Sequence, residues 1–496
     1  MPALVDELLR DAAAEHPERE AYVHGVDRLT YSELDRAADG FAAVLLEHQV
    51  ARGDRVCLLL PSSIDFAVCY LGALRVGAIT SAVNLRLGAT EVASIVERTE
   101  PSVTVVDNGR RPPAGPDPGV VIGRVELHNA FREPAPPDAA LPRRAPDDAT
   151  CIVWTSGTTG APKGAVYDHT TQEAISRNIG ELTVDAERRL VVLPFPHVGY
   201  MTRMWDELAY VTTLVLAGEP WSATETLRLI RDEGITMATG VPTQWSLVLG
   251  HADLARTDFS GLRVAGIGGA AIAPELVRSM RAVLGCPVLS RYTSTEAGVT
   301  TSTRIGDPDE AVAETVGRPA PDVELRIVDP ERADCRGVEP GSVGEVICRS
   351  PAMMRAYWRD PERTAEVIDA AGYLHTGDLG FVGADGNLRL VGRLKEMYIR
   401  GGYNVYPAEV ESVLVEHPAV ARVAVVGAPD PVLGEIGAAF VVPADSGHPL
   451  ALEALRDLCR SRLADYKAPD RLVIVDELPL TSMLKVDTRE LLRRLG

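Results

Sequence analysis

The amino-acid sequence predicts an α/β protein with a largely parallel sheet and more than one domain. Strand-like and helix-like segments alternate in the first half, as in the strand Arg55–Leu60, the helix Ile64–Val76 and the strand Val103–Val106. Parallel strands need crossover helices, so this alternation predicts a sheet covered on both faces. With 496 residues the chain is also too long for one ordinary core, which predicts two or more domains.

The other elements follow from local patterns. The spacing of apolar residues predicts a helix over residues 4–17 and a short strand over residues 21–24. Thr30-Tyr31-Ser32-Glu33 has the Ser/Thr-x-x-Glu form of a capping box, and apolar spacing through Leu46 predicts a long helix after it. Residues 108–148 are crowded with proline and charge, and we expect exposed connecting loops there.

Patterns in the second half continue this alternation. A strand is expected over residues 287–289, before a polar motif, and a helix is expected from Pro274, because proline favours the first helical position. Near the end of the chain a helix from Ala408, a strand over Val423–Val426 and a helix over Arg489–Leu495 indicate a compact α/β domain.

Composition excludes several classes of protein. The net charge of −20 opposes nucleic acid or an anionic membrane as partner, because both need a basic surface. The seven cysteines are scattered without a Cys-x-x-Cys pair, which argues against a disulfide framework and against a zinc site. The chain begins without a basic leader segment and has no apolar run of membrane-spanning length, so we expect a cytoplasmic protein.

Residues 155–164 have the composition of a phosphate-binding loop. The β-prone run Cys151–Trp154 leads into Thr155-Ser156-Gly157-Thr158-Thr159-Gly160-Ala161-Pro162-Lys163-Gly164. Hydroxyl and glycine residues permit a tight turn whose backbone N–H groups converge on an anion, and Lys163 adds positive charge. A plain surface turn is the alternative. A Walker loop is excluded, because Pro162 and Gly164 flank the lysine where glycine and Ser/Thr are required.

The ten residues of this loop resemble the signature loop of the adenylate-forming superfamily, which includes acyl-CoA synthetases, adenylation domains of peptide synthetases and firefly luciferase. Further motifs of that superfamily follow in order over nearly the whole chain: Arg291-Tyr292-Thr293-Ser294-Thr295-Glu296, Gly372-Tyr373-Leu374-His375-Thr376-Gly377-Asp378, Gly392-Arg393-Leu394-Lys395-Glu396, and the terminal loop that holds Lys485. Thr293 and Leu484 stand where the family has glycine. The four lysines of the chain, Lys163, Lys395, Lys467 and Lys485, all fall at lysine positions of the family.

The resemblance implies a site for ATP and AMP. Gly266–Ala271 taken alone is close to a dinucleotide fingerprint, but a helix that begins near Pro274 starts too late for it, and the family uses this turn as a wall of the adenine pocket. Asp378 is implied to accept the ribose hydroxyls. The implied ATP- and AMP-binding residues are Thr155, Ser156, Gly157, Thr158, Thr159, Gly160, Lys163, Gly269, Ala270, Ala271, Tyr292, Thr293, Ser294, Asp378 and Arg393.

The resemblance also implies catalytic, metal and acyl-binding residues. Lys485, Thr295 and Glu296 are the implied catalytic residues, and Thr155 and Glu296 the implied Mg²⁺ ligands. The remaining implied residues are His197, Trp205, Val241 and Gly266 in the acyl pocket, and Gly401 and Gly402 in the coenzyme A channel.

The implied fold has two domains. Residues 1–394 would form a large domain of stacked, largely parallel sheets with flanking helices, which binds ATP and the acyl group. Residues 395–496 would form a small mobile α/β lid, with the hinge at Lys395. Dimers are common among relatives, so the resemblance is compatible with a homodimer.

The implied reaction joins a carboxylic acid to a thiol at the expense of ATP. The acid attacks ATP to form acyl-AMP and pyrophosphate, and the thiol of coenzyme A then displaces AMP. Two alternatives remain open: an adenylating enzyme that loads an acyl carrier protein or an amine, and a non-catalytic relative that binds acyl-AMP. Small alicyclic, aromatic or medium-chain acids are the expected substrates.

Overall fold

The computed structural model describes residues 4–107, 109–132, 135–136, 141–155, 162–270, 272–330, 335–444, 450–481 and 485–495. Within these residues the strands form four sheets, here called sheets A to D. Sheets A and B contain long parallel stretches, whereas sheet C is antiparallel and sheet D is mostly so. The predicted α/β class is confirmed.

Sheet A has the strand order β15-β14-β13-β12-β11-β9-β10-β1-β2 and is parallel from β13 to β1. Its strands are β1 (Glu20–His24), β2 (Asp27–Thr30), β9 (Arg188–Val191), β10 (Thr213–Leu216), β11 (Met237–Gly240), β12 (Val264–Gly268), β13 (Val288–Ser294), β14 (Gly298–Ser302) and β15 (Arg318–Pro319).

Sheet B has the order β18-β8-β7-β4-β3-β5-β6 and is parallel from β7 to β6. Its strands are β3 (Arg55–Leu59), β4 (Ile79–Ala82), β5 (Val103–Val106), β6 (Val120–Gly123), β7 (Ala149–Thr155), β8 (Lys163–Asp168) and β18 (Ala356–Tyr357). Because β7 and β8 run antiparallel, the two ends of the predicted phosphate loop, Thr155 and Lys163, lie opposite each other.

Sheets C and D are built from the last third of the chain. Sheet C contains β16 (Glu324–Val328), β17 (Gly344–Arg349), β19 (Leu374–Val382) and β20 (Leu388–Arg393). Sheet D contains β21 (Tyr398–Arg400), β22 (Tyr403–Val405), β23 (Val420–Asp430), β24 (Gly434–Pro443) and β25 (Arg471–Ile474). The turn that holds Lys395 therefore joins the last strand of sheet C to the first strand of sheet D.

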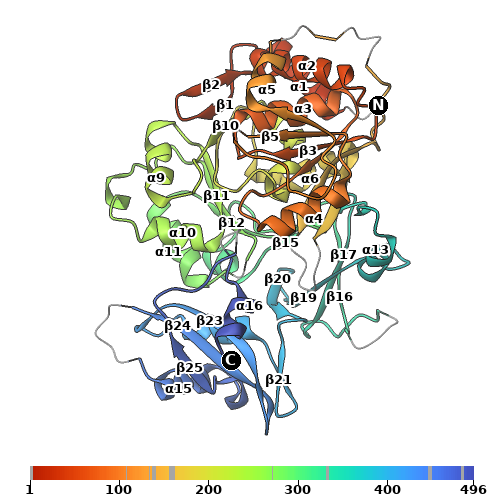
Figure 1. The fold of residues 1–496 in the computed structure, drawn as a ribbon. Helices are drawn as coiled ribbons and strands as arrows, with labels where there is room; N and C mark the ends of the chain where they lie inside the picture. The colour runs from red at the N-terminus through yellow and green to blue at the C-terminus, as the bar shows by residue number, and fades with distance from the viewer. Residues whose placement is uncertain are drawn as a thin grey trace.

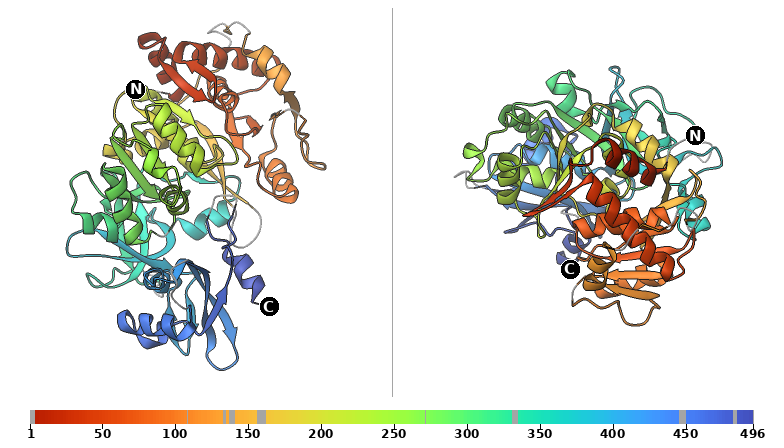
Figure 2. Two further views of the ribbon diagram at one scale, coloured as in Figure 1. Left: turned by 90° about the vertical axis from the view of Figure 1, so that its left-hand side faces the viewer. Right: turned by 90° about the horizontal axis from the view of Figure 1, so that it is seen from above.

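Helices pack on these sheets. Those of the first half are α1 (Val5–Glu15), α2 (Tyr31–Glu47), α3 (Ile64–Arg75), α4 (Ala89–Thr99), α5 (Arg124–Ala130), α6 (His169–Ile179), α7 (Val198–Met201), α8 (Met204–Ala209), α9 (Ala223–Asp232) and α10 (Pro242–Leu249). Those of the second half are α11 (Pro274–Leu284), α12 (Asp309–Glu314), α13 (Pro361–Val367), α14 (Pro407–Leu414), α15 (Leu452–Arg462) and α16 (Thr488–Arg494). In Figure 1 sheet D and its helices form a lower body beneath the rest of the chain, and the left view of Figure 2 shows the same separation.

The largest hydrophobic core takes side chains from sheets A and B and from the helices packed against them. Helices α2 and α3 approach each other closely at Gly72, where a Cβ atom would lie 2.8 Å from the carbonyl oxygen of Ala38. The predicted capping box begins α2, because Thr30 Oγ1 accepts from the Glu33 N–H at 3.3 Å and Glu33 accepts from the Thr30 N–H at 2.9 Å. Within the described residues, every helix is too short or too polar to cross a membrane.

The prediction of exposed loops over residues 108–148 is wrong in its middle. Strand β6 pairs in parallel with β5 and extends sheet B, and α5 follows it directly. Leu127 and Ala130 of α5 are buried. Proline and charge on either side obscured the strand and helix, whose stability comes from pairing and burial against β5 and α2 rather than from their own composition.

Candidate active site

An open cavity lies where sheet A meets the end of the chain. It encloses about 900 Å³, counting the space at its mouth. Strand ends β11, β12 and β13 and the segment around α7 supply its walls, and Lys485 from the C-terminal body also lines it. The predicted residues that line this cavity are His197, Val241, Gly266, Gly269, Thr293, Ser294 and Lys485.

A hydrogen-bonded cluster fixes the predicted ribose-binding carboxylate. Asp378 of β19 is 5% exposed, and its Oδ2 accepts a hydrogen bond from the Tyr292 hydroxyl at 2.5 Å. Arg393 Nε lies 2.8 Å from Asp378 Oδ1. Burial and the carboxylate of Asp378 raise the pKa of Tyr292, so its hydroxyl stays protonated and can donate. Three predicted nucleotide residues are thus brought together from β13, β19 and β20.

A second cluster joins the predicted metal ligand to the phosphate loop. The Tyr357 hydroxyl donates to Glu296 Oε1 at 2.8 Å, and Lys163 Nζ lies 5.0 Å from the centre of the Tyr357 ring. The Tyr167 hydroxyl donates to the Thr295 carbonyl oxygen and holds the backbone beside Glu296. Tyr357 was not predicted as a site residue. It lies outside the family motifs, so no sequence pattern indicates this role.

Several predicted residues lie outside the described part of the chain. These are Ser156, Gly157, Thr158, Thr159 and Gly160 of the phosphate loop, Ala271 of the adenine wall, and Leu484 beside the catalytic lysine. Thr155, which flanks the loop, is half-buried, and its hydroxyl donates to the Lys163 carbonyl oxygen at 3.4 Å.

Thr293 fits its position without the left-handed backbone that favours glycine. It belongs to β13, pairs with Val299 of β14, and does not have a positive φ. The pairing register of β13 shifts between Tyr292 and Thr293, which marks a local irregularity there. A β-branched residue suits this extended conformation.

Two nitrogen-bearing side chains of different kinds, His197 and Lys485, line the cavity. Burial and then the charge of Lys485 lower the pKa of His197 to about 3, so the imidazole is neutral at physiological pH. The Gly199 N–H donates to His197 Nδ1 at 3.1 Å, which leaves Nε2 as the protonated nitrogen. Lys485 stays accessible to solvent, yet its enclosed setting and the charge of Arg393 lower its pKa.

Arg291 is a candidate residue that the sequence did not single out. It lines the cavity, is 8% exposed, and its Nε and Nη2 atoms find no acceptor among the described residues. Burial and the neighbouring Arg203 lower the pKa of Arg291 to about 9, so the guanidinium stays charged at neutral pH. Arg203, which also lines the cavity, is paired with Asp206 at 2.6 Å. The only sequence signal was an arginine directly before the aromatic residue of a family motif.

Other predicted residues lie away from this cavity. Trp205 is half-buried against the main core and is not among the described residues that line the cavity. Ala270 is exposed next to Gly269. Gly401 and Gly402 form the exposed turn between β21 and β22, with φ of +57° and +87°. Both turn residues therefore have the backbone that glycine adopts most easily.

Comparison with known proteins places this arrangement in a family. Residues 9–358 match the family described as AMP-binding enzyme, and residues 409–485 match its C-terminal domain. The chain belongs to the AMP-binding enzyme family. This AMP-binding enzyme is 36% identical over 517 residues to a 3-[(3aS,4S,7aS)-7a-methyl-1,5-dioxo-octahydro-1H-inden-4-yl]propanoyl:CoA ligase of Rhodococcus jostii (strain RHA1), with 98% of this chain and 97% of that protein covered.

Two further similarities bear on acceptor and fold. The AMP-binding enzyme is 33% identical over 483 residues to the fatty acid–[acyl-carrier-protein] ligase ScoC of Streptomyces coeruleorubidus, covering 93% of this chain and 91% of ScoC. The crystal structure of ATP-bound MatB from Rhodopseudomonas palustris matches with a TM-score of 0.90 and 28% identity, covering 100% and 99% of the two chains. The predicted adenylate-forming superfamily and enzyme class, an AMP-forming acid–thiol ligase, are confirmed.

Proposed function

We propose that this AMP-binding enzyme is an acyl-CoA ligase that activates a carboxylic acid as acyl-AMP and passes the acyl group to coenzyme A. The observation that carries the proposal is Lys485, because this residue from the C-terminal body lines the same cavity as His197 and Thr293. An ammonium group at this place is suited to a reaction in which negative charge builds between a carboxylate and a phosphate. The CoA ligase of Rhodococcus jostii supports the acceptor.

The first step needs positioning and charge neutralisation. A carboxylate oxygen of the acid attacks the α-phosphorus of ATP, the bond to the β-phosphate oxygen breaks, and pyrophosphate leaves. Lys485 and the Thr295 hydroxyl would contact the α-phosphate, and Lys163 the departing pyrophosphate. The paired Asp378 and Arg393 would hold the ribose.

The donor set near Glu296 fits a magnesium ion. Mg²⁺ prefers oxygen ligands and takes only one or two carboxylates from the protein. Glu296 offers a carboxylate whose orientation is set by Tyr357, and Thr155 offers a hydroxyl. These two residues would hold the ion, which supplies positive charge against the phosphate oxygens.

The second step calls for a different placement of the C-terminal body. Rotation about the turn at Lys395 would withdraw Lys485 and bring the turn at Gly401 and Gly402 to the cavity. The thiol sulfur then attacks the acyl carbonyl carbon, the bond to the AMP phosphate oxygen breaks, and the thiol proton leaves to solvent. Two glycines without side chains would let a pantetheine arm pass close to backbone.

Arg291 restricts which carboxylic acids suit the cavity. A buried guanidinium without an acceptor is costly, because its lost hydration is not replaced. The carboxylate whose charge acts on Arg291, Asp206, already binds Arg189 at 2.9 Å and Arg203. The rest of the acyl wall is largely apolar, with Leu193, Val241 and Ile267. We therefore propose an alicyclic, aromatic or medium-chain acid that carries a second acceptor oxygen, such as a ketone or carboxylate, away from the reacting carboxyl group.

The test is acid-dependent exchange between ATP and labelled pyrophosphate over pairs of acids that share a carbon skeleton and differ by one distal oxygen. Coenzyme A is then added to each positive acid and the thioester is measured. Exchange with the oxygen-bearing members, followed by thioester formation, is the expected result. Exchange without thioester would instead favour an acyl carrier protein, the acceptor named for ScoC, or an amine as acceptor. ATP binding without exchange for any acid would favour a non-catalytic relative.

A further inference from the structure

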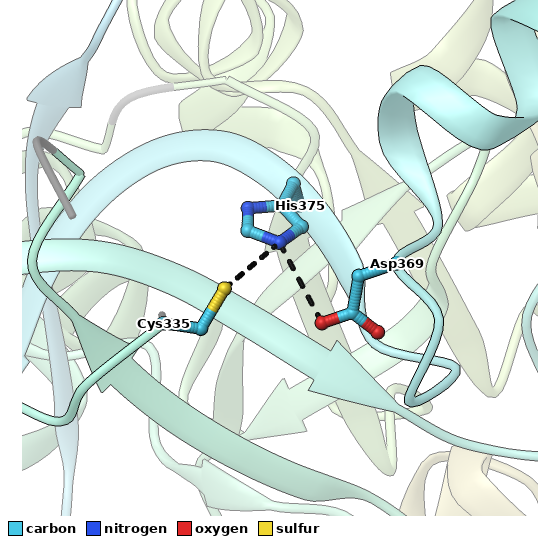
Figure 3. Close-up of side chains that lie close together, drawn as sticks. All are labelled: Cys335, Asp369 and His375. Carbon is cyan, nitrogen blue, oxygen red and sulfur yellow. Dashed lines mark hydrogen bonds and ion pairs between the residues drawn. The ribbon is translucent and has the colours of Figure 1, made fainter. Parts of the chain in front are cut away.

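Three potential metal ligands from two segments meet at sheet C: Cys335 follows β16, Asp369 shortly precedes β19, and His375 lies at the start of β19. Figure 3 shows Cys335, Asp369 and His375 with their side chains directed toward one another. Cys335 Sγ lies 3.7 Å from His375 Nε2, and Asp369 Oδ2 lies 3.8 Å from the same nitrogen. One ligand atom of each residue lies within 4.8 Å of the other two. This cluster is separate from the cavity that Lys485 lines.

The distances suit a small tetrahedral ion. Bond lengths of about 2.3 Å to sulfur and about 2.0 Å to nitrogen or oxygen place neighbouring ligand atoms of a tetrahedral zinc ion about 3.3–3.6 Å apart. The two separations at His375 Nε2 exceed this range by only a few tenths of an ångström. Cys335 Sγ and the ligand oxygen of Asp369, which lie within 4.8 Å of each other, would approach by side-chain rotation to complete the shell.

A second carboxylate orients the imidazole. His375 Nδ1 lies 2.9 Å from Glu345 Oε2, and Glu345 is 7% exposed. Glu345 Oε1 accepts from the Gly377 N–H at 3.1 Å, which fixes the carboxylate in turn. A protonated Nδ1 donating to Glu345 leaves the Nε2 lone pair aimed at Cys335 and Asp369. This is the carboxylate–histidine arrangement that supports metal-bound imidazoles.

The other two ligands are also held in place. Asp369 Oδ1 accepts from the N–H groups of Ala371 at 2.9 Å and Tyr373 at 2.8 Å, which turns Oδ2 toward His375. Cys335 has a φ of +48°, a backbone conformation that non-glycine residues adopt rarely. The side chains of His375 and Asp369 are 27% and 24% exposed, so an ion can enter from solvent.

We propose that Cys335, Asp369 and His375 form a binding site for a divalent transition metal of the zinc type. Thiolate, imidazole and carboxylate supply three ligands and water supplies the fourth. Binding releases the thiol proton of Cys335 to solvent. The ion ties the segment after β16 to the start of β19. Cysteine spacing in the sequence argues against a zinc site, but that rule detects neighbouring cysteines, whereas this site draws its ligands from residues 335, 369 and 375.

The test is titration of chelator-treated full-length protein with Co²⁺, read by absorbance. We expect a thiolate-to-cobalt charge-transfer band and visible d–d bands of tetrahedral intensity, both saturating at one equivalent. Cys335→Ser removes the charge-transfer band. Asp369→Asn, which keeps an oxygen for the backbone N–H groups, weakens binding and retains the band. His251→Gln is the matched control, because His251 also lies 3.8 Å from an aspartate carboxylate, that of Asp253, without a cysteine.

A second readout separates the three-ligand site from binding to a single thiol. Zn²⁺ raises the melting temperature of the wild type and of His251→Gln, and this rise is lost in Cys335→Ser and His375→Gln. Glu345→Gln reduces Zn²⁺ affinity by about 10- to 100-fold, as expected for loss of a ligand-orienting carboxylate. The proposal would be overturned by the absence of both cobalt bands in the wild type or by a charge-transfer band that survives in Cys335→Ser. Equal Zn²⁺ affinity in the wild type and in His375→Gln would also overturn it.

Discussion

Two parts of the predicted active site differ in how their charges are satisfied: the predicted nucleotide-binding and metal-binding residues, called the nucleotide side, and the cavity that Lys485 lines, called the acyl side. On the nucleotide side, Asp378 binds Tyr292 and Arg393, and Glu296 binds Tyr357. On the acyl side, Arg291 is buried without an acceptor among the described residues, and His197 is neutral. The charged groups of the nucleotide side are paired within the chain. On the acyl side the guanidinium of Arg291 is left for a bound molecule to pair with.

This difference follows from what each side would bind under the proposed function. ATP is the same for every member of such a family, so its groups can be met by a site that is already hydrogen-bonded. The acid differs between relatives, and selectivity for a polar group is strongest where a buried donor stays unpaired without it. Variants on the two sides should therefore behave differently across a panel of acids.

The largest effect is expected from Lys485→Ala, which removes the cation between the two sides. Exchange between ATP and pyrophosphate should fall by about 10²–10³-fold with every acid, the usual loss for one group that stabilises transition-state charge. Lys467→Ala is the matched control, because Lys467 binds Glu409 within the C-terminal body at 2.6 Å and does not line the cavity. An equal loss in both variants would mean that domain integrity, not the charge at residue 485, controls exchange.

The next largest effect is expected from Arg291→Met and should depend on the acid. For acids with a distal oxygen, kcat/KM should fall by about 10- to 100-fold, the range for a hydrogen bond to a charged group. For acids with the same carbon skeleton but without that oxygen, kcat/KM should not fall. The free energy of unfolding should stay level or rise, because an unpaired buried charge is removed.

The surface variant Arg228→Met serves as control for Arg291→Met, since Arg228 lies on the exposed side of α9. Equal losses for both members of each acid pair in Arg291→Met would contradict the assignment of Arg291 to the acid. Such equal losses would indicate instead that Arg291 acts on the nucleotide side.

A smaller and acid-independent effect is expected from Tyr292→Phe. The change removes one donor to Asp378, and we expect the KM for ATP to rise about fivefold with all acids alike. Tyr403→Phe is the control, because Tyr403 is 57% exposed on sheet D. A loss that varied with the acid would break the division between the two sides.

The smallest effect is expected from His197→Gln, and it concerns how the free energy of unfolding depends on pH. The pKa of His197 is lowered to about 3 in the folded chain, against about 6.5 when unfolded. Between these values the unfolded state binds more protons, so the wild type loses stability as pH falls below about 6.5. His197→Gln should lose less on acidification to pH 4, measured by urea unfolding, and match the wild type in slope above pH 7. A steeper loss in the variant would contradict an imidazole that is neutral in the folded state.

Much of the nucleotide side was predictable from sequence because its residues lie in short motifs. Tyr292, Asp378 and Arg393 were named from such motifs, and the structure brings them together. Tyr357 was missed, since a hydroxyl that orients Glu296 belongs to no local pattern. Of the residues predicted for the acyl pocket, His197 and Val241 line the cavity, whereas Trp205 packs against the core, and their role in binding the acyl group stays a prediction.

The sequence by itself determined the family, the order of the motifs and local structure such as the capping box of Thr30 and Glu33. These depend on residues close together in the chain, where spacing specifies geometry. Only the tertiary structure decided that β6 and α5 form within residues 108–148, that Arg291 is buried without a partner among the described residues, and that Cys335 meets His375. Burial and the convergence of distant side chains depend on how the sheets pack, and no local spacing encodes that packing.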